Sequence, residues 1–429
     1  MGMKKNCKTD KIETLCVQAG YTPKVGEPRV APIVQSTTFY YEEAEQLANL
    51  FDLKDNGYFY SRLGNPTCGV LEDKVCALEG GVGALCTSSG QSANMTAILN
   101  VCSSGDHIVC SRTIYGGTSN LFSVTLKRMG VDITFVKPDA TIEELESAIQ
   151  DNTKVIFGET IANPAITVLN FEEYAFVAKK YGILFVVDNT LATPVHARPL
   201  ELGANIVTHS TTKYMDGHAT SVGGIIVEGK FNFKNNPRYK TFNEPDDSYH
   251  GLVYADIETA PFTVKARVQL IRDTGMMMSP MNAFLTNLGT ETLHLRMERT
   301  SSNALKVAEF LKGSDKIEFV KYPYLVGDKE YNTAVKYLNG GAGGMISFGL
   351  KGGRDACEKF ISNLKLLALV THVADLRSSV IHPASTTHRQ LSSEGLIEAG
   401  VPENLIRLSI GIEHIDDILE DIKQAIEKI

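Results

Sequence analysis

The sequence comprises 429 residues with a mass of 46.9 kDa, of which 43% are hydrophobic and 21% are charged. This length predicts two or three domains, and the composition is typical of a globular chain rather than a disordered or fibrous one. Because the formal net charge is −8 and no run of basic residues exceeds two, we do not expect the protein to bind nucleic acid. The apolar runs fall far short of the roughly 18 residues that cross a membrane, so we expect a cytoplasmic protein that binds no membrane.

The eight cysteines, at positions 7, 16, 68, 76, 86, 102, 110 and 357, are too few for a disulfide framework and contain no C-x-x-C pair. We expect reduced thiols. Cys102 and Cys110 lie near each other in the sequence, but they lack His, Asp or Glu partners at the spacing of metal ligands. The sequence therefore predicts no metal site.

Residues 1–60 contain three prolines, at positions 23, 28 and 32, and few periodic apolar positions. We interpret this segment as an N-terminal arm that lies on another surface. From about residue 80 to 230, short apolar runs alternate with helix-like stretches, which is the rhythm of βαβ units. The predicted strands are 107–110, 133–137, 155–159, 183–188, 205–209 and 223–227.

Runs such as 183–187 (Ile-Leu-Phe-Val-Val) are apolar at successive positions, which predicts parallel strands covered by helices on both faces. We therefore expect an α/β fold with a mainly parallel central sheet, forming a large cofactor-binding domain over residues 61–255. Ligands of such sheets bind beyond the carboxyl ends of the strands. Glu159, Asp188 and Ser210 stand at such ends.

After about residue 255 the pattern changes to amphipathic helices at 303–311, 357–367 and 415–429, with strands at 317–321, 344–350 and 405–410. This predicts a smaller C-terminal α+β domain over residues 256–429.

The residues with the strongest chemical signal are grouped around one lysine. Lys213 stands among small hydroxyl residues directly after a predicted strand, and Asp188 closes the strand before it. A hydroxyl-rich turn, residues 88–93, opens a helix whose free N–H groups can bind phosphate. Tyr115 follows another strand, where its ring can lie over a planar ligand. An amine for an aldehyde, an acid for a pyridinium nitrogen, a phosphate site and a stacking ring together fit pyridoxal phosphate.

These residues resemble the pyridoxal-phosphate enzymes of cysteine and methionine metabolism, whose fold is of the aspartate-aminotransferase-like type (fold type I). The matching stretches occur in the family's order over about 350 residues. They are 60–67 (Tyr-Ser-Arg-Leu-Gly-Asn-Pro-Thr), 88–91, 115–118, Glu159 with Asn163 and Pro164, 187–190, 209–214 and 405–413.

The resemblance implies a role for each matching residue. Lys213 would hold the cofactor as a Schiff base and act as the catalytic base, Asp188 would keep the pyridine nitrogen protonated, and Tyr115 would stack on the ring. The other implied cofactor-binding residues are Ser89, Gly90, Gln91, Glu159, Asn163, Ser210 and Thr212, together with Tyr60 and Arg62 from a neighbouring subunit of a homotetramer built as a dimer of dimers. On the substrate side, the implied residues are Arg407, which would pair with the α-carboxylate, His372 and Asn163.

Within the family, the chain is most similar to the O-acetylhomoserine sulfhydrylases, on the basis of residues 244–252, 266–284 and 381–391. This similarity implies γ-replacement on O-acetyl-L-homoserine by sulfide or methanethiol, giving homocysteine or methionine plus acetate. Such enzymes usually read Asn-Val-Gly-Asp-Ala-Arg where this chain has His372 and Ala374 in the stretch 371–377, so the substrate-side wall differs.

Two kinds of alternative are open. The first is a lyase or synthase of the same family, either methionine γ-lyase or a cystathionine γ-lyase or synthase. Methionine γ-lyases typically have a reactive Cys two residues after the stacking Tyr, where this chain has Gly117. The second is a non-catalytic scaffold, which predicts the loss of a cofactor residue, yet all of them are present. The identity of the acceptor, sulfide or methanethiol, and of the leaving group, acetyl or succinyl, is left open.

Overall fold

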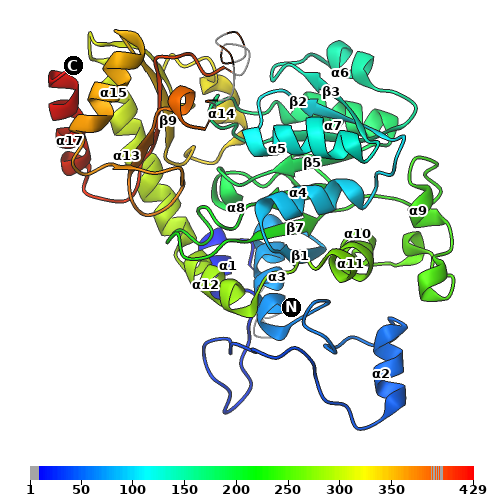
Figure 1. The fold of residues 1–429 in the computed structure, drawn as a ribbon. Helices are drawn as coiled ribbons and strands as arrows, with labels where there is room; N and C mark the ends of the chain where they lie inside the picture. The colour runs from blue at the N-terminus through cyan, green and yellow to red at the C-terminus, as the bar shows by residue number, and fades with distance from the viewer. Residues whose placement is uncertain (1–8, 388, 390–391, 393, 395, 397–399) are drawn as a thin grey trace.

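The computed structural model describes residues 9–387, 389, 392, 394, 396 and 400–429. Figure 1 shows a large central sheet flanked by helices, a smaller sheet at the upper left, and an extended N-terminal segment at the bottom. The long helix α13 (Leu293–Lys312) runs between the large domain and the smaller sheet. The predicted layout of a large α/β domain followed by a smaller C-terminal domain is therefore present.

The central sheet has the strand order β1-β7-β6-β5-β4-β2-β3. All neighbouring strands are parallel except β7, which is antiparallel to β1 and β6. The strands are β1 (Gly83–Thr87), β2 (His107–Ser111), β3 (Asp132–Val136), β4 (Thr153–Glu159), β5 (Leu184–Asp188), β6 (Ile206–His209) and β7 (Gly224–Glu228).

The prediction that the run 223–227 is a parallel strand is wrong. The connection 210–223 contains turns and no helix, so nothing carries the chain back across the sheet and β7 returns alongside β6 in the opposite direction. The strand β1 was not predicted, because its sequence Gly-Ala-Leu-Cys-Thr is short, begins with Gly and Ala, and has only one β-branched residue of the kind typical of strands.

Helices cover both faces of the central sheet, as predicted. On one face, Val186 of β5 belongs to a core with Ala93 of α4; on the other, Val187 belongs to a core with Tyr174 of α7. Successive strand residues thus pack on opposite layers. The helices of this part are α3 (Pro66–Glu79), α4 (Gly90–Leu99), α5 (Gly116–Asn120), α6 (Ile142–Ala148), α7 (Phe171–Tyr181), α8 (Thr193–His196), α9 (Lys240–Asn243), α10 (Pro261–Ala266), α11 (Arg272–Thr274) and α12 (Pro280–Glu291).

The smaller sheet has the order β10-β11-β12-β9-β8. Its strands are β8 (Ile317–Lys321), β9 (Met345–Leu350), β10 (Ala368–Leu369), β11 (Ser379–Ile381) and β12 (Leu405–Ser409), and its helices are α14 (Tyr331–Tyr337), α15 (Gly353–Asn363) and α17 (Ile415–Glu427). The strands predicted at 317–321, 344–350 and 405–410 are all present. The domain boundary predicted at 255–256 precedes α10 and α12, which pack on the central sheet and on α3. These contacts favour a boundary near α13.

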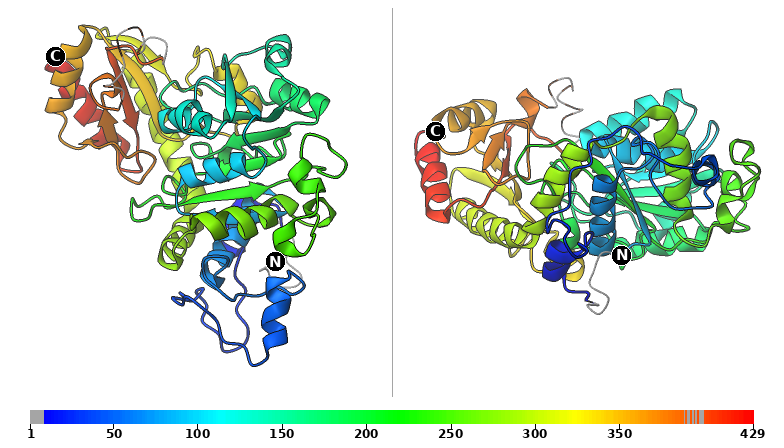
Figure 2. Two further views of the ribbon diagram at one scale, coloured as in Figure 1. Left: turned by 45° about the vertical axis from the view of Figure 1, so that its right-hand side comes forward. Right: turned by 90° about the horizontal axis from the view of Figure 1, so that it is seen from below.

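The N-terminal segment has two parts with different surroundings. Helix α1 (Ile12–Gln18) buries Leu15 and Cys16 against α3, α12 and α13. The following residues, with α2 (Ala44–Phe51), lie below the central sheet in the left view of Figure 2. Residues 32–38 also bond to the segment that leads into and begins α3, for example from the N–H of Val34 to Oγ1 of Thr67 at 2.8 Å. The predicted arm thus touches its own chain through α1 and through residues 32–38.

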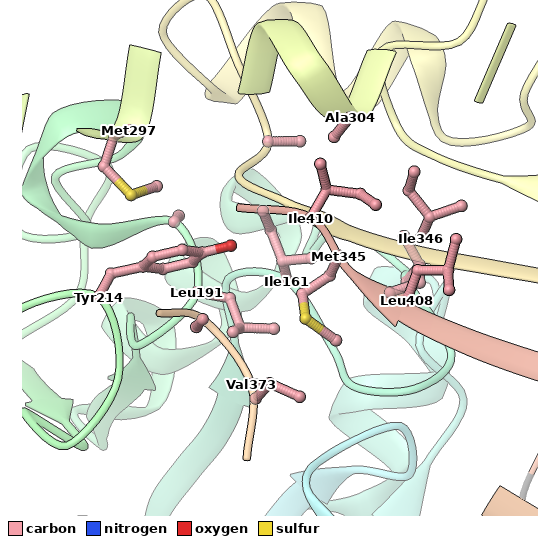
Figure 3. Close-up of a cluster of buried hydrophobic side chains, with 14 of the residues drawn as sticks. Ile161, Leu191, Tyr214, Met297, Ala304, Met345, Ile346, Val373, Leu408 and Ile410 are labelled. Carbon is pink, nitrogen blue, oxygen red and sulfur yellow. The ribbon is translucent and has the colours of Figure 1, made fainter. Parts of the chain in front are cut away.

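A hydrophobic cluster joins the two sheets (Figure 3). Leu191 and Tyr214 come from the large domain, while Met345 and Leu408 come from β9 and β12 of the smaller sheet. The Tyr214 hydroxyl accepts a hydrogen bond from the N–H of Gly344 at 2.7 Å. Because Tyr214 directly follows Lys213 in the chain, this packing fixes the backbone that carries the lysine.

Within the described residues, no helix is long and apolar enough to cross a membrane. No group of three or more His, Cys, Asp and Glu residues in that part of the chain could hold a metal ion. The seven cysteines that lie in it are free thiols, and Cys7 falls outside the described residues.

Candidate active site

Polar residues gather at the carboxyl ends of β4, β5 and β6. Glu159 lies beside Asp188 in the register of β4 and β5, and Asp188 lies beside Thr208 of β6. The hydroxyl of Thr190 donates to the Asp188 carboxylate and accepts from the N–H of Ser210 at 2.8 Å. Thr190 therefore ties the end of β5 to the loop that carries Lys213.

The Asp188 carboxylate has a defined orientation. Its Oδ1 also accepts from the N–H of Thr190 at 3.0 Å, and its Oδ2 accepts from Nδ2 of Asn94 at 3.1 Å. Asn94 is itself held, because its Oδ1 accepts from the Thr208 hydroxyl at 2.6 Å. Sequence reasoning missed Asn94. The one hint in the sequence is an amide side chain one turn into a helix that is otherwise formed mostly by small or apolar residues.

The N-terminus of α4 is built to receive an anion. Ser89 caps the helix by accepting from the N–H of Ser92 at 3.1 Å. The N–H groups of Gly90 and Gln91 donate to no protein acceptor in the part of the chain that the structure describes, which leaves them free for phosphate. A Cβ on Gly90 would lie 2.5 Å from Cβ of Ser210, so only glycine permits the helix to approach the lysine loop this closely.

Tyr115 projects at the start of α5 with 51% of its surface exposed. Its N–H donates to Oε1 of Glu159 at 2.7 Å, so Glu159 holds the backbone that carries the ring. Burial, reinforced by the neighbouring Asp188, raises the pKa of Glu159 well above its usual range. A Cβ on Gly117 would lie 2.5 Å from the Tyr115 ring and 2.8 Å from the Gln91 amide nitrogen. The ring thus folds over a position that has no side chain.

Lys213 lies in the half-buried loop after β6, held by Tyr214 in the cluster of Figure 3. Its Nζ lies 3.4 Å from Nδ1 of His372. Burial, together with the nearby guanidinium of Arg407 and against the opposing effect of Asp375, lowers the pKa of Lys213 to about 8. A lysine with this pKa is partly neutral near pH 8, as a nucleophile or base requires.

Arg407 projects from β12 of the smaller sheet and is 7% exposed. Its two long contacts, both at 3.4 Å, are donated by Nη1 to Oδ1 of Asn163 and by Nη2 to the carbonyl oxygen of Thr371. Its Nε is buried without a partner, and burial lowers the pKa of Arg407 to about 10. A buried guanidinium with weakly used donors is suited to bind a carboxylate with two oxygens.

The structure does not bring every predicted residue to this group. Tyr60 and Arg62 lie at the end of the arm, with the Arg62 guanidinium 4.7 Å from the Tyr60 ring centre. No hydrogen bond or ion pair within the described residues joins either of them to the residues around Lys213. The Thr212 hydroxyl bonds to the carbonyl oxygen and the N–H of Gly223 at 3.2 and 3.0 Å, and so braces the lysine loop.

A buried polar group lies behind the strand ends and was also missed. Oε1 of Glu79, at the end of α3, accepts from Nδ2 of Asn189 at 2.8 Å and lies 2.7 Å from Nε2 of His209. Asn189 follows Asp188, and His209 precedes Ser210. The three side chains therefore set the relative position of the two chain segments that carry Asp188 and Lys213.

A comparison with known families identifies this arrangement. The family model described as Cys/Met metabolism PLP-dependent enzyme matches residues 13–427. The chain belongs to this family. The family and the fold class predicted from the sequence are thus confirmed, and the cofactor of the family is pyridoxal phosphate.

Several members of the family that are similar to this chain have related names. O-acetyl-L-homoserine sulfhydrylase of Leptospira meyeri is 45% identical, over 98% of this chain and 97% of the relative. Homocysteine synthase of Schizosaccharomyces pombe is 42% identical, over 98% and 99%. A solved structure described as an O-acetylhomoserine (thiol)-lyase from Campylobacter jejuni, containing N'-pyridoxyl-lysine-5'-monophosphate, has a TM-score of 0.95 and 40% identity, over 97% of this chain and 100% of that one.

The site residues fit pyridoxal phosphate on the structure's own geometry. The free N–H groups at the start of α4 suit its phosphate, and the oriented carboxylate of Asp188 suits its pyridine nitrogen. The partly neutral amine of Lys213 suits its aldehyde. Within the described residues, no hydrogen bond joins a Lys or Arg side chain to the residues at the N-terminus of α4.

Proposed function

We propose that the chain catalyses γ-replacement on O-acetyl-L-homoserine, with sulfide or methanethiol as acceptor, giving homocysteine or methionine plus acetate. The names of the relatives that match nearly the whole chain support this choice of substrate. The single structural observation that carries the proposal is Arg407, a buried guanidinium with unfilled donors on the side of the site that faces Lys213.

In this proposal each residue of the site has a defined role. Arg407 and Asn163 bind the α-carboxylate of the substrate and thereby present Cα–H to Lys213. Lys213 binds the cofactor covalently and, once displaced by the substrate amine, takes protons as the neutral base. When bound, pyridoxal phosphate stabilises negative charge on the carbon next to the amino group. Asp188 keeps the pyridine nitrogen protonated, and Tyr115 covers the ring.

The phosphate is held by the N–H groups of Gly90 and Gln91, with the hydroxyls of Ser89, Ser210 and Thr212 around it. The cation for the phosphate is supplied by Arg62, with Tyr60, of a second copy of the chain, and the working form is a homotetramer built as a dimer of dimers. Two observations support this assembly. Arg62 Nε is buried without a partner, and the arm exposes large apolar side chains such as Tyr40 and Phe51.

A lyase that breaks down methionine is the competing function, and Gly117 argues against it. A methionine γ-lyase would carry a reactive Cys at this position, but a Cβ there would meet the Tyr115 ring at 2.5 Å. The ring would have to move before a thiol could be accommodated. Acetate is also a weaker base than methanethiolate and leaves Cγ more readily, so an activated homoserine suits a site without this thiol.

Steady-state kinetics with each substrate test the proposal. We expect kcat/KM for O-acetyl-L-homoserine with sulfide or methanethiol to exceed that for methionine cleavage by at least about a hundredfold, which corresponds to roughly 2.7 kcal/mol in transition-state stabilisation. O-succinyl-L-homoserine is the control for the leaving group. Equal or faster release of methanethiol and a 2-oxo acid from methionine would refute the assignment and favour the lyase.

A further inference from the structure

The imidazole of His372 occupies an unusual position beside the lysine. Its Nδ1 lies 3.4 Å from Lys213 Nζ, while its Nε2 is buried without a hydrogen-bond partner and lies 3.9 Å from the carboxylate of Asp375. Lysine, imidazole and carboxylate are therefore in sequence, with the two ring nitrogens directed at different groups. A ring in this position can accept a proton on the side of Lys213 and be compensated on the side of Asp375.

The backbone around His372 is held firmly, so the position is not that of a loose surface side chain. Val373 packs in the hydrophobic cluster between the two sheets (Figure 3). Ala374 adopts a left-handed conformation, with φ of 64°, and its N–H donates to Oγ of Ser409 at 2.7 Å. The N–H of Leu376 donates to the carbonyl oxygen of Gly217 at 2.9 Å. The segment is thus attached to both β12 and the lysine loop.

We propose that His372 is a second acid–base residue, which exchanges protons with Lys213 Nζ. This inference rests on the proposed γ-replacement, in which one substrate loses a proton from Cα and then one from Cβ. Lys213 takes the Cα proton and passes it to Nδ1 of His372, so that the neutral amine is free to take the Cβ proton. Acetate leaves as the anion with its bonding pair. After the thiol adds at Cγ, both protons return through Lys213 to Cβ and Cα. The only proton released is the one that the thiol loses when its sulfur bonds to Cγ.

The charges around the ring suit this use. Four charged groups face it: Lys213, Asp375, Asp216 and Arg377. Burial, and next the charge of Lys213, lowers the pKa of His372, so the imidazole is neutral at rest. Because the same shift leaves the ring a weaker base than Lys213, the ring holds the proton only transiently. When it becomes an imidazolium, Asp375 offsets the charge. The amide of an Asn placed here by His372→Asn could make hydrogen bonds but could not take up a proton.

Hydrogen exchange into an unreactive amino acid separates the two proton transfers. Enzyme with bound cofactor is incubated in D₂O with L-2-aminobutyrate, which has Cα and Cβ hydrogens but no leaving group, and the loss of each signal is followed by NMR. We expect His372→Asn to slow exchange at Cβ at least about tenfold while exchange at Cα stays within about twofold. The matched control is His414→Asn, at the exposed N-cap of α17, which should change neither rate. Equal slowing at both carbons, or no slowing at Cβ, would overturn the proposal.

A second measurement uses the full chain without cofactor and does not depend on turnover. The rate at which diethyl pyrocarbonate modifies the peptide that contains His372 reports its neutral fraction at each pH. Removing the neighbouring charge in Lys213→Met should raise the midpoint of this profile by at least about half a pH unit, and an unchanged midpoint would refute the contact. Wild-type enzyme that exchanges Cβ hydrogens through His372 but does not use O-acetylhomoserine would refute the proposed substrate and leave this role in place.

Discussion

The group around Lys213 and the arm differ in how much of their surroundings one chain supplies. Asp188, Lys213 and Arg407 come from both sheets, and each is held by hydrogen bonds or by packing within the chain. The arm beyond α1 leaves large apolar side chains in solvent, with Tyr40 86% exposed and Phe51 56% exposed. Apolar groups of this size are normally covered.

This difference shows which parts of the site can function alone. The amine of Lys213, the carboxylate of Asp188 and the guanidinium of Arg407 are positioned by the chain itself. Arg62, which we propose as the cation for the phosphate, is not brought to them, since it lies with the arm and contacts Tyr60 instead. A fully active monomer would show that one chain holds the whole site. Recovery of activity on mixing two defective variants would show that two chains share it.

We expect the largest effect from replacing Lys213, which is positioned within a single chain. Replacing Lys213 with Ala removes both the bond to the cofactor and the base, so we expect kcat to fall by at least about a thousandfold. Borohydride should bleach the yellow colour of the wild-type enzyme. In the variant it should produce no change in absorbance, because no reducible bond to the cofactor is present. Lys230→Ala, at an exposed position, is the control. A reducible band in Lys213→Ala without added amine would assign the cofactor to another lysine.

The next effect concerns the carboxylate site. Arg407→Lys keeps a positive charge but loses the planar pair of donors, so we expect kcat/KM to fall about a hundredfold, mainly through a higher KM. Arg299→Lys, on the exposed side of α13, should change nothing. An unchanged KM for the amino-acid substrate would show that another group binds the carboxylate.

The arm should show a smaller effect that depends on a second copy. Arg62→Ala removes the proposed phosphate cation, so we expect the pyridoxal phosphate concentration for half-saturation to rise roughly tenfold, whereas Lys24→Ala on the same arm should leave it unchanged. At a cofactor concentration that leaves Arg62→Ala nearly empty, mixing it with Lys213→Ala should restore activity. One of the two shared sites in a mixed dimer then has both intact residues. No recovery after demonstrated subunit exchange would mean that each site belongs to one chain.

The smallest expected effect is a shift in a pH profile. Because burial lowers the pKa of Lys213 from its usual value to about 8, the neutral amine increases as the pH rises through 8. The rate at which the cofactor-free chain recombines with pyridoxal phosphate should increase over the same range and then level off. Arg407→Met removes a charge that lowers this pKa, so the midpoint should move upward, and Arg299→Met should leave it in place. A midpoint near the usual value for lysine would contradict the burial of Lys213.

Much of the fold could be predicted because local patterns encode it. Successive apolar residues in 183–187 indicated a strand covered on both faces, and β5 has this environment. The pattern did not indicate the direction of β7, since a fully apolar run suits either orientation and the turn-rich connection 210–223 decides it. The matching stretch 381–391 extends beyond the described residues at 388, 390 and 391, and its contribution stays a prediction.

The site was predictable where it follows from strand ends. Glu159, Asp188 and Ser210 were expected together, and β4, β5 and β6 bring them there. Asn94 and Glu79 were not expected, because an isolated polar residue in a helix carries no local sign of the group it will contact. Their roles appear only when α3 and α4 dock on the sheet.

The family, most strands of the two sheets and the kinds of chemical group available could be read from the sequence alone. These follow from residue types and short periodic patterns, which act over one or two turns of the chain. The packing of the smaller sheet against the large domain places Arg407 within reach of Asn163, 244 residues away. The same packing places His372 beside Lys213. Such distances depend on how two hydrophobic surfaces close on each other around Tyr214, and packing between distant segments is a property of the whole chain rather than of any local pattern.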